Sequence, residues 1–166
     1  MIKQAIIPLA GLGTRLLPLT SVFAKELLPI NGKAGIEYIL DECIEAGIKE
    51  VVFIISKKKI MIKNYFYNDK FYKKIIKKKK KIKKNLKKNK FKKKKNKKKK
   101  DPRIINEYKK ILKYKKMIKF VYQNKPLGTG DAVLKTKKLI KNKFFLMLLP
   151  DDLIIKKNCS KSMIKI

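Results

Sequence analysis

Apolar residues gather in short runs along the first third of the chain. Residues 5–9 and 51–55 are continuous apolar runs, which are typical of strands buried on both faces. Between them, residues 36–46 carry apolar side chains at helical spacing, and Gly47 is well placed to end that helix. A strand, a helix and a second apolar strand in this order predict a parallel sheet covered by helices on both faces.

The last third of the chain has the same character. Residues 120–122 predict a strand, residues 131–139 a helix that Asp131 can cap, and residues 144–149 a strongly apolar strand. This last strand ends at Pro150-Asp151-Asp152. We therefore expect an α/β fold, a three-layer α/β/α Rossmann-like domain around a mostly parallel sheet.

The middle zone, about residues 57–116, is dominated by lysine. Low-complexity runs occur at residues 77–81 and 92–100, with sparse apolar residues around them. Like charges three and four positions apart oppose helix formation, and so few apolar side chains cannot offset the entropy of ordering the chain. We expect a Lys-rich insertion that is mobile or loosely helical, without fixed structure at 87–100, lying outside the functional crevice.

The charge of the chain is extreme: 47 Lys plus Arg against 12 Asp plus Glu give +35. Charge of this kind indicates a partner such as nucleic acid or an anionic membrane. Nearly all the basic residues are lysine, however, and they accompany abundant Ile and Asn with no Trp or His. That combination favours a mutational bias over a selected polyanion site, which would use more arginine. Both interpretations stay open.

The cellular compartment is inferred from three features that the sequence does not show: cysteines at a metal or redox spacing, a signal peptide and a membrane span. Cys43 and Cys159 match no metal or redox spacing and are expected to be reduced thiols. The apolar start has neither the length nor the cleavage pattern of a signal peptide. No stretch approaches the ~20 apolar residues that a membrane span requires. We expect a cytoplasmic protein with no membrane partner.

Candidate chemistry begins directly after the first strand, at Ala10-Gly11-Leu12-Gly13-Thr14-Arg15. Glycines here let the backbone turn sharply and bring N–H groups close to a phosphate, and Arg15 adds a fixed cation. The spacing is neither the dinucleotide fingerprint nor a Walker A loop. A plain structural turn is the alternative. Lys25 follows in a lysine-poor stretch, and on its own it would be interpreted as a solvated lysine.

Several spaced motifs then occur in one order: Gly11 to Arg15, Leu17-Pro18, Thr20, and Lys25-Glu26-Leu27-Leu28-Pro29. Together they resemble the signature of the sugar-phosphate nucleotidyltransferases. The Lys-Glu-Leu-Leu-Pro form and residues 42–48 are most similar to the bacterial UTP–glucose-1-phosphate uridylyltransferases. The segment 123–133 and Leu148-Leu149-Pro150-Asp151-Asp152 extend this resemblance over nearly the whole chain outside the Lys-rich zone.

The resemblance implies an enzyme that joins UTP and glucose 1-phosphate to give UDP-glucose and pyrophosphate, with Mg²⁺ as cofactor. It implies Arg15 and Lys25 as catalytic residues and Asp151 as the metal ligand, with Asp152 beside it either supporting that ligand from outside the metal's own shell or as a bystander. The nucleotide-binding residues that it implies are Ala10, Gly11, Leu12, Gly13, Thr14, Glu26, Gln123 and Gly128. Gln123 and Gly128 would meet the uracil edge, since an amide has both a donor and an acceptor. We expect the main site residues around one crevice at the carboxyl ends of the strands.

The chain also departs from the family pattern. Ala24 replaces the usual proline before the lysine, Lys33-Ala34-Gly35 replaces a usual Lys-Pro segment, and Thr129 and Asp131 replace the common Leu and His. Family members continue well past Asp151, so we expect a truncated domain, the N-terminal part, over residues 1–166. Two alternatives remain: a degenerate relative that binds nucleotide without catalysis, and a Lys-rich polyanion-binding protein that contacts nucleic acid without sequence preference. A homo-oligomer is left open.

Overall fold

The structure is a computed structural model that describes residues 2–76, 102–154 and 157–165. The chain divides into two compact units, Met1–Tyr65 with Met117–Ile166, and Phe66–Lys116. Predictions that fall on residues 77–101, including the expected lack of structure at 87–100, lie outside the described residues. In the part of the chain that the structure describes, no helix has the length and hydrophobicity needed to cross a membrane.

The first unit is built on a parallel sheet of four strands, in the order β5-β4-β1-β6. The strands are β1 (Gln4–Pro8), β4 (Glu50–Ile55), β5 (Ile118–Tyr122) and β6 (Leu146–Met147). Their register places Ile6 opposite both Val52 and Met147. The predicted apolar runs form these strands because each run can be buried on both faces, and residues 5–7 and 51–55 are almost inaccessible to water.

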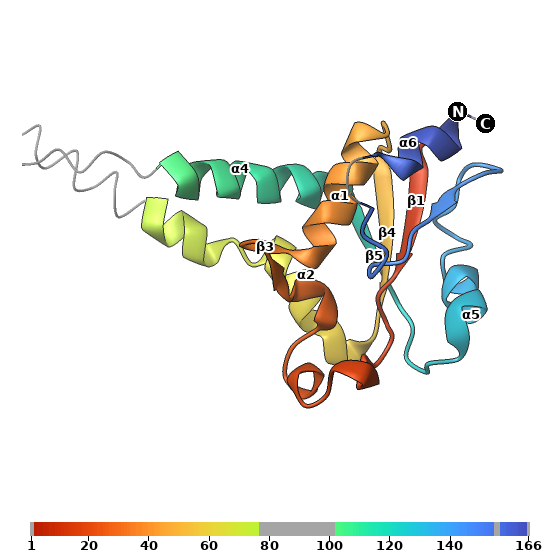
Figure 1. Cartoon of the computed structure of the whole chain (residues 1–166), viewed down its shortest axis with the longest axis horizontal. Coiled ribbons are helices and arrows are strands. Elements are labelled where there is room, and N and C mark those ends of the chain that lie inside the picture. Colours follow the sequence, from red (N-terminus) through yellow and green to blue (C-terminus); the bar gives the residue numbers. More distant parts are fainter. Residues whose placement is uncertain (1, 77–101, 155–156, 166) are drawn as a thin grey trace, which may run out of the picture. The chain divides into compact units, whose positions relative to one another are not determined.

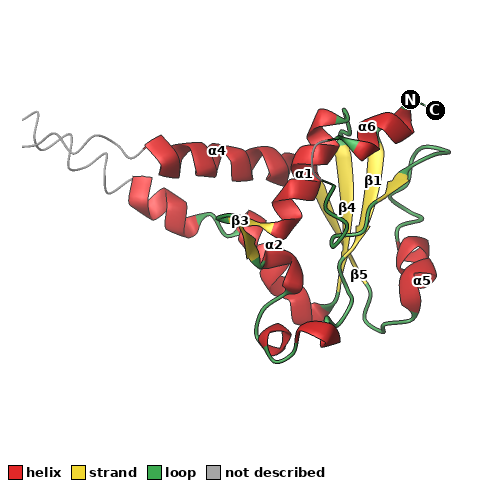
Figure 2. Ribbon diagram, viewed as in Figure 1, coloured by secondary structure: helices red, strands yellow, loops and turns green. Residues whose placement is uncertain are grey.

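Helices cover the two faces of this sheet, as Figures 1 and 2 show. On one face Ile6, Val52 and Ile54 pack with Ala132 of α5 (Gly128–Lys135). Alternate strand residues point to the opposite face, where α1 (Gly35–Glu45) lies. The α1 residues Ile36, Ile39, Leu40 and Cys43 are buried. Burial raises the pKa of the Cys43 thiol to about 12, with the negative Glu42 adding to the effect. The predicted three-layer α/β/α arrangement is confirmed.

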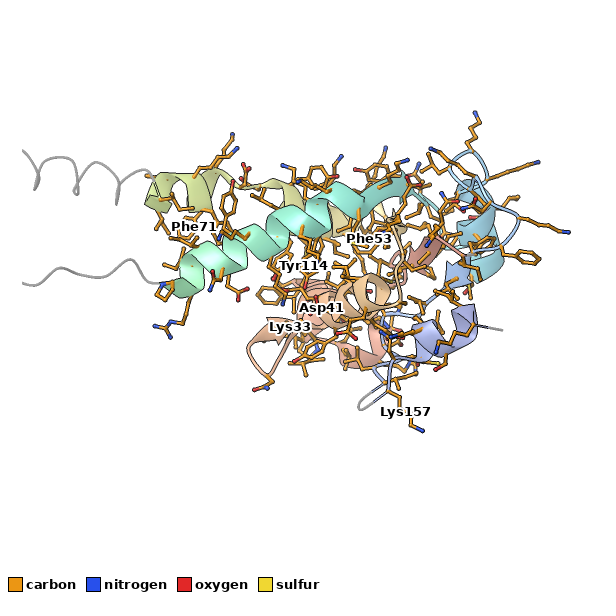
Figure 3. The ribbon with its side chains drawn as sticks, turned by 90° about the horizontal axis from the view of Figure 1, so that it is seen from above. Lys33, Asp41, Phe53, Phe71, Tyr114 and Lys157 are labelled. Carbon is orange, nitrogen blue, oxygen red and sulfur yellow. The ribbon has the colours of Figure 1, made fainter. Side chains whose placement is uncertain are left out.

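Two further elements attach to α1. The hairpin of β2 (Pro29–Ile30) and β3 (Lys33–Ala34) turns at Asn31-Gly32, both at positive φ, the backbone that a two-residue hairpin turn needs. Lys33 forms an ion pair with Asp41 of α1 (Figure 3). The short helix α6 (Cys159–Ile164) contacts α1 through Ser160, whose Oγ donates to Glu42 Oε1 at 2.7 Å.

The second α/β connection differs from its prediction. The helix begins at Gly128, three residues before the expected start, so Asp131 lies within its first turn and Leu127 is at the N-cap. Asp131 therefore does not cap the helix. The helix also ends early, at Lys135, because the Thr136 hydroxyl donates to the Val133 carbonyl at 2.6 Å, a local bond that competes with continued helix.

The last strand is also shorter than predicted. Residues 144–149 were expected to form it, but only Leu146 and Met147 pair with β1, and the Leu148 N–H adds one bond to the Ile6 carbonyl at 3.0 Å. This strand lies at the edge of the described sheet, so it has a partner on one side only. Phe144 is 64 % exposed. The apolar run 144–149 predicted a strand that is buried on both faces. At the edge of the sheet, part of this run is exposed instead.

The second unit holds most of the long helix α4 (Pro102–Met117) and a short helical stretch at 70–76. Helix α2 (Ile60–Tyr67) crosses from the first unit into it. Inside the second unit the Tyr72 and Tyr108 rings stack at 5.4 Å, and Phe66 meets Tyr114 edge to face at 6.1 Å. Aromatic contacts therefore hold the helices of this lysine-rich unit together despite their like charges.

Candidate functional site

A cavity of about 280 Å³ opens at the carboxyl ends of the parallel strands of the first unit. Chain order places β4 and β5 on one side of β1 and places β6 on the other. The chain therefore switches, after β5, from adding strands on one side of β1 to adding β6 on the other side. Open α/β sheets bind ligands at such a switch point, which here lies between β1 and β6. The lining residues of the cavity come from the segments after three strand ends and include Ala10, Gly11, Lys25, Gln123, Gly128 and Asp151.

The glycine loop after β1 contributes Ala10 and Gly11 to the cavity. Gly13 has φ 71°, a left-handed conformation, and its carbonyl accepts a bond from Thr20 Oγ1 at 2.8 Å. A Cβ atom at Gly13 would lie 3.1 Å from Thr20 Cγ2, whereas a Cβ atom at Gly11 would meet nothing within 4 Å. The left-handed backbone and the contact with Thr20 therefore require glycine at position 13. At position 11, glycine leaves open space beside the cavity.

The rest of this loop lies beyond the cavity wall. Leu12, Gly13, Thr14 and Arg15 are not among its lining residues, and Thr14–Leu16 forms a single 3₁₀ turn. Arg15 is nevertheless close enough for its charge to act on Asp151, whose pKa it helps to lower. Of the loop residues predicted to bind nucleotide, the structure brings two into the cavity and leaves Arg15 at its margin.

Lys25 and Asp151 meet inside the cavity, although they are 126 residues apart in the chain. The Lys25 Nζ donates to Asp151 Oδ2 at 2.9 Å, and the two side chains are 24 % and 54 % exposed. The hydrogen bond from Lys25 is the main cause that holds the pKa of Asp151 below its usual value, and the charges of Lys25 and Arg15 act in the same direction. The cavity therefore contains an ionised carboxylate beside two cations.

Glu26, the next residue, points into the protein. Both its carboxylate oxygens accept bonds from Lys59 Nζ, at 2.7 and 2.9 Å, and the side chains are 1 % and 10 % exposed. Lys25–Leu27 and Lys57–Lys59 are each one 3₁₀ turn, so this pair fastens the two turns together. Sequence reasoning missed Lys59, because nothing distinguishes it from the two lysines before it. Glu26 also lines the cavity, but its carboxylate is occupied by Lys59.

A second contact holds the same loop. The N–H of Ala24, a buried residue, donates to Met61 Sδ at 3.2 Å. Ala24 stands where the family commonly has proline, which has no N–H to satisfy. The substitution introduces a buried donor, and the methionine sulfur of the neighbouring helix satisfies it.

Gln123 follows β5 directly and is 5 % exposed while it lines the cavity. Its Nε2 donates to the Gly128 carbonyl at 3.0 Å and to Asp131 Oδ2 at 2.8 Å. Gly128 has φ 90°, which favours glycine. The bond from Gln123 is the main cause that lowers the pKa of Asp131. Two predicted base-reading residues therefore contact each other here, through a side chain and a backbone carbonyl.

The acidic residues of the described part of the chain do not form a cluster of three or more metal-binding side chains. Asp151 is a single ionised carboxylate in the cavity wall. This fits Mg²⁺, which usually takes one or two protein carboxylates and completes its shell with substrate phosphates and water. The donor set does not fit a structural metal site made of protein ligands alone.

A larger cavity, about 640 Å³, lies between α1, the β2–β3 hairpin and the segment before α6. Its lining includes Lys33, Asp41, Glu42 and Lys157. None of the residues predicted for the site lies there, and it is not at the carboxyl ends of the strands. Position in the fold therefore favours the smaller cavity.

Comparison with known proteins identifies the family. Residues 4–165 match the nucleotidyl transferase family. A UTP–glucose-1-phosphate uridylyltransferase of Mycoplasma pneumoniae is 37 % identical over 155 residues, which are 92 % of this chain and 45 % of the relative. A putative enzyme of the same name from Methanocaldococcus jannaschii is 34 % identical over 99 % of this chain and 50 % of its own.

Solved structures give the same result. A UTP-bound UGPase from Acinetobacter baumannii aligns with a TM-score of 0.77 at 31 % identity, over 99 % of this chain and 52 % of that one. The chain thus spans about half the length of the relatives and structures that it matches. The family match over nearly its whole length, together with the crevice between β1 and β6, places this chain in the nucleotidyl transferase family.

Proposed function

We propose that this chain carries the nucleotide-binding site of a cytoplasmic UTP–glucose-1-phosphate uridylyltransferase. In the reaction, a phosphate oxygen of glucose 1-phosphate forms a bond to the α-phosphorus of UTP. The bond from that phosphorus to the bridging oxygen breaks, and pyrophosphate leaves. The observation that carries the proposal is the meeting of Lys25, Asp151 and the glycine loop in one cavity at the ends of β1 and β6.

The triphosphate would lie along the glycine loop. Gly11 leaves room for a phosphate oxygen to approach the backbone, because no side chain occupies the space beside it. Lys25 is the cation that would contact the α-phosphate and the leaving pyrophosphate, where charge develops. Arg15 at the margin would hold the outer phosphates. These groups act by orienting the triphosphate and neutralising its charge.

Asp151 is the residue that would hold Mg²⁺, since it is ionised and lies in the cavity wall. The ion would supply positive charge to phosphate oxygens and help to orient them. Lys25 would then exchange its present carboxylate partner for phosphate oxygens. Asp151 thus contributes an anionic anchor, and Lys25 contributes a cation that is already directed at the same place.

The base would be read at the end of β5. Uracil offers a donor at N3 and acceptors at O2 and O4. Gln123 and the Gly128 backbone present an amide and a peptide group at the cavity wall. A purine is larger and has a different pattern of donors and acceptors, so UTP should bind better than ATP or GTP.

The first test is binding. Isothermal titration calorimetry with Mg²⁺ should give a higher affinity for UTP than for ATP or GTP, and Lys25→Ala and Asp151→Asn should each weaken UTP binding. Lys49→Ala is the matched control, because Lys49 is exposed at the opposite, amino-terminal end of β4. Equal affinity for all three nucleotides would reduce the site to a generic phosphate site and contradict the proposal.

The second test is turnover, measured as pyrophosphate release from UTP with and without glucose 1-phosphate. Sugar-dependent release that Lys25→Ala lowers at least ~10²-fold would support catalysis, since one preorganised donor to developing charge contributes about that factor. UTP binding without any sugar-dependent release would instead favour a relative that binds nucleotide and does not catalyse.

A further inference from the structure

The Gln123 amide is held in one orientation by two acceptors. Its Nε2 lies 3.0 Å from the Gly128 carbonyl oxygen and 2.8 Å from Asp131 Oδ2. A carbonyl oxygen accepts and never donates, and an ionised carboxylate does the same. Reversing the amide would place its oxygen against two other oxygens. The NH₂ group must therefore face Gly128 and Asp131, which leaves Oε1 as the polar atom of this side chain for a ligand.

An acceptor that faces N3 of the base, rather than its C4 substituent, distinguishes the two common pyrimidines. Uracil has a hydrogen on N3 and can donate to Oε1, whereas N3 of cytosine has a lone pair and would repel it. We propose that Asp131 is a positioning residue that fixes the Gln123 amide and so makes the site select uracil over cytosine. The proposal rests on the proposed function, in which Gln123 meets the base, and it assigns the choice of pyrimidine to a residue that need not touch the nucleotide.

Other roles for Asp131 are weaker. It does not cap α5, because the helix begins three residues earlier. Its contact with Lys135, at 3.3 Å, joins a half-exposed lysine to the 19 % exposed Asp131 on one helix, and such pairs near the surface contribute little to stability. The bond from the nearly buried Gln123 is shorter and is charge-assisted. The bond with the Gln123 amide is therefore the contact that best accounts for Asp131 at this position.

The test compares UTP and CTP by calorimetry with Mg²⁺ at constant ionic strength. Both nucleotides have the same triphosphate, so a change of charge near the phosphates cancels in the ratio of their affinities. Asp131→Asn removes the charged acceptor and lets residue 131 donate to Oε1, so a reversed Gln123 amide would meet one opposing oxygen, that of Gly128, in place of two. We expect the UTP:CTP affinity ratio to fall about tenfold, the loss of one charge-assisted hydrogen bond.

Asp152→Asn is the matched control, because it removes the same charge from an exposed residue beside the cavity, and it should leave the ratio unchanged. Asp131→Ala is a second variant that suits a helix and removes the acceptor without adding a donor. It should weaken UTP binding without strengthening CTP binding. Thermal unfolding of each variant checks the fold.

Two outcomes separate the inference from the proposed function. If the unmodified chain prefers UTP and Asp131→Asn keeps the ratio within about twofold, Asp131 does not control the amide and the inference is wrong while the proposed function stands. If the unmodified chain binds UTP and CTP equally, or binds neither, base reading by Gln123 is wrong and both fall together.

Discussion

Two neighbouring residues, Lys25 and Glu26, have opposite environments. Lys25 faces the cavity and pairs with the exposed Asp151, whereas Glu26 faces inward and pairs with the buried Lys59. Successive side chains of a 3₁₀ turn point about a third of a turn apart, so one turn can direct a cation to a ligand and an anion to the core. The buried pair thereby fixes the direction of Lys25.

We expect Lys59→Met to destabilise the protein by about 3–5 kcal/mol, because it leaves the Glu26 carboxylate buried without a partner. Urea unfolding followed by circular dichroism measures this. Lys58→Met is the control, since Lys58 is exposed and its loss should cost less than ~0.5 kcal/mol. The double variant Glu26→Leu with Lys59→Met should recover most of the loss. A single variant as stable as the control would show that the ion pair does not hold the turn.

At the scale of elements, the pattern of apolar residues predicted the parallel sheet. Strands of such a sheet are covered by helices on both faces, so their side chains are mostly apolar and form continuous runs. The pattern failed where local side-chain bonds or an edge position decided the result. Thr136 ends α5 early, and residues 144–149 pair over only two positions. The hairpin at Asn31-Gly32 was not predicted, although that dipeptide is a hairpin signal.

The candidate site was predictable to a similar degree. Motif order pointed to Lys25, Gln123 and Asp151, and the structure places all three in the cavity wall. Lys59 and the contact between Gln123 and Asp131 were missed, because both depend on which side chains meet after folding. A run of identical lysines contains no information about which one is buried.

The two loop glycines should respond differently to alanine. Gly13→Ala should lower the free energy of unfolding by about 1–2 kcal/mol, because the residue has positive φ and its Cβ would press on Thr20. Gly11→Ala should change stability by less than ~0.5 kcal/mol yet weaken UTP binding, since its methyl group would occupy the space proposed for a phosphate. Chemical unfolding and calorimetry on both variants separate the effects. Unchanged UTP affinity in Gly11→Ala would argue against backbone contact with phosphate.

At the scale of the whole molecule, the net charge of +35 is concentrated in lysines outside the candidate cavity. Charge of this size attracts any polyanion. Sequence-specific recognition of unpaired bases uses aromatic side chains on which the bases stack, and the lysine-rich runs at 77–81 and 92–100 contain none. Nucleic-acid binding, where it occurs, is therefore expected to be independent of sequence.

Fluorescence anisotropy with two duplexes of equal composition and scrambled sequence tests this. We expect equal affinities, falling at least about a hundredfold between 50 and 200 mM salt, because counterions released from the duplex dominate binding by many lysines. A clear preference for one duplex, or an affinity that salt does not change, would point to a selected nucleic-acid site instead.

The short edge strand β6 has a consequence for the colloidal behaviour of the protein. In the described sheet, the other edge strand presents the charged Lys119, whereas β6 lies in the uncharged run 144–149, the composition that favours strand-to-strand aggregation. Mutual repulsion of like-charged molecules should keep these edges apart at low ionic strength. Raising the salt shortens the range of that repulsion, so light scattering should detect growing particles, and Met147→Lys should suppress them. High net charge would then keep in solution a sheet whose described edge strand β6 has no charged side chain of its own.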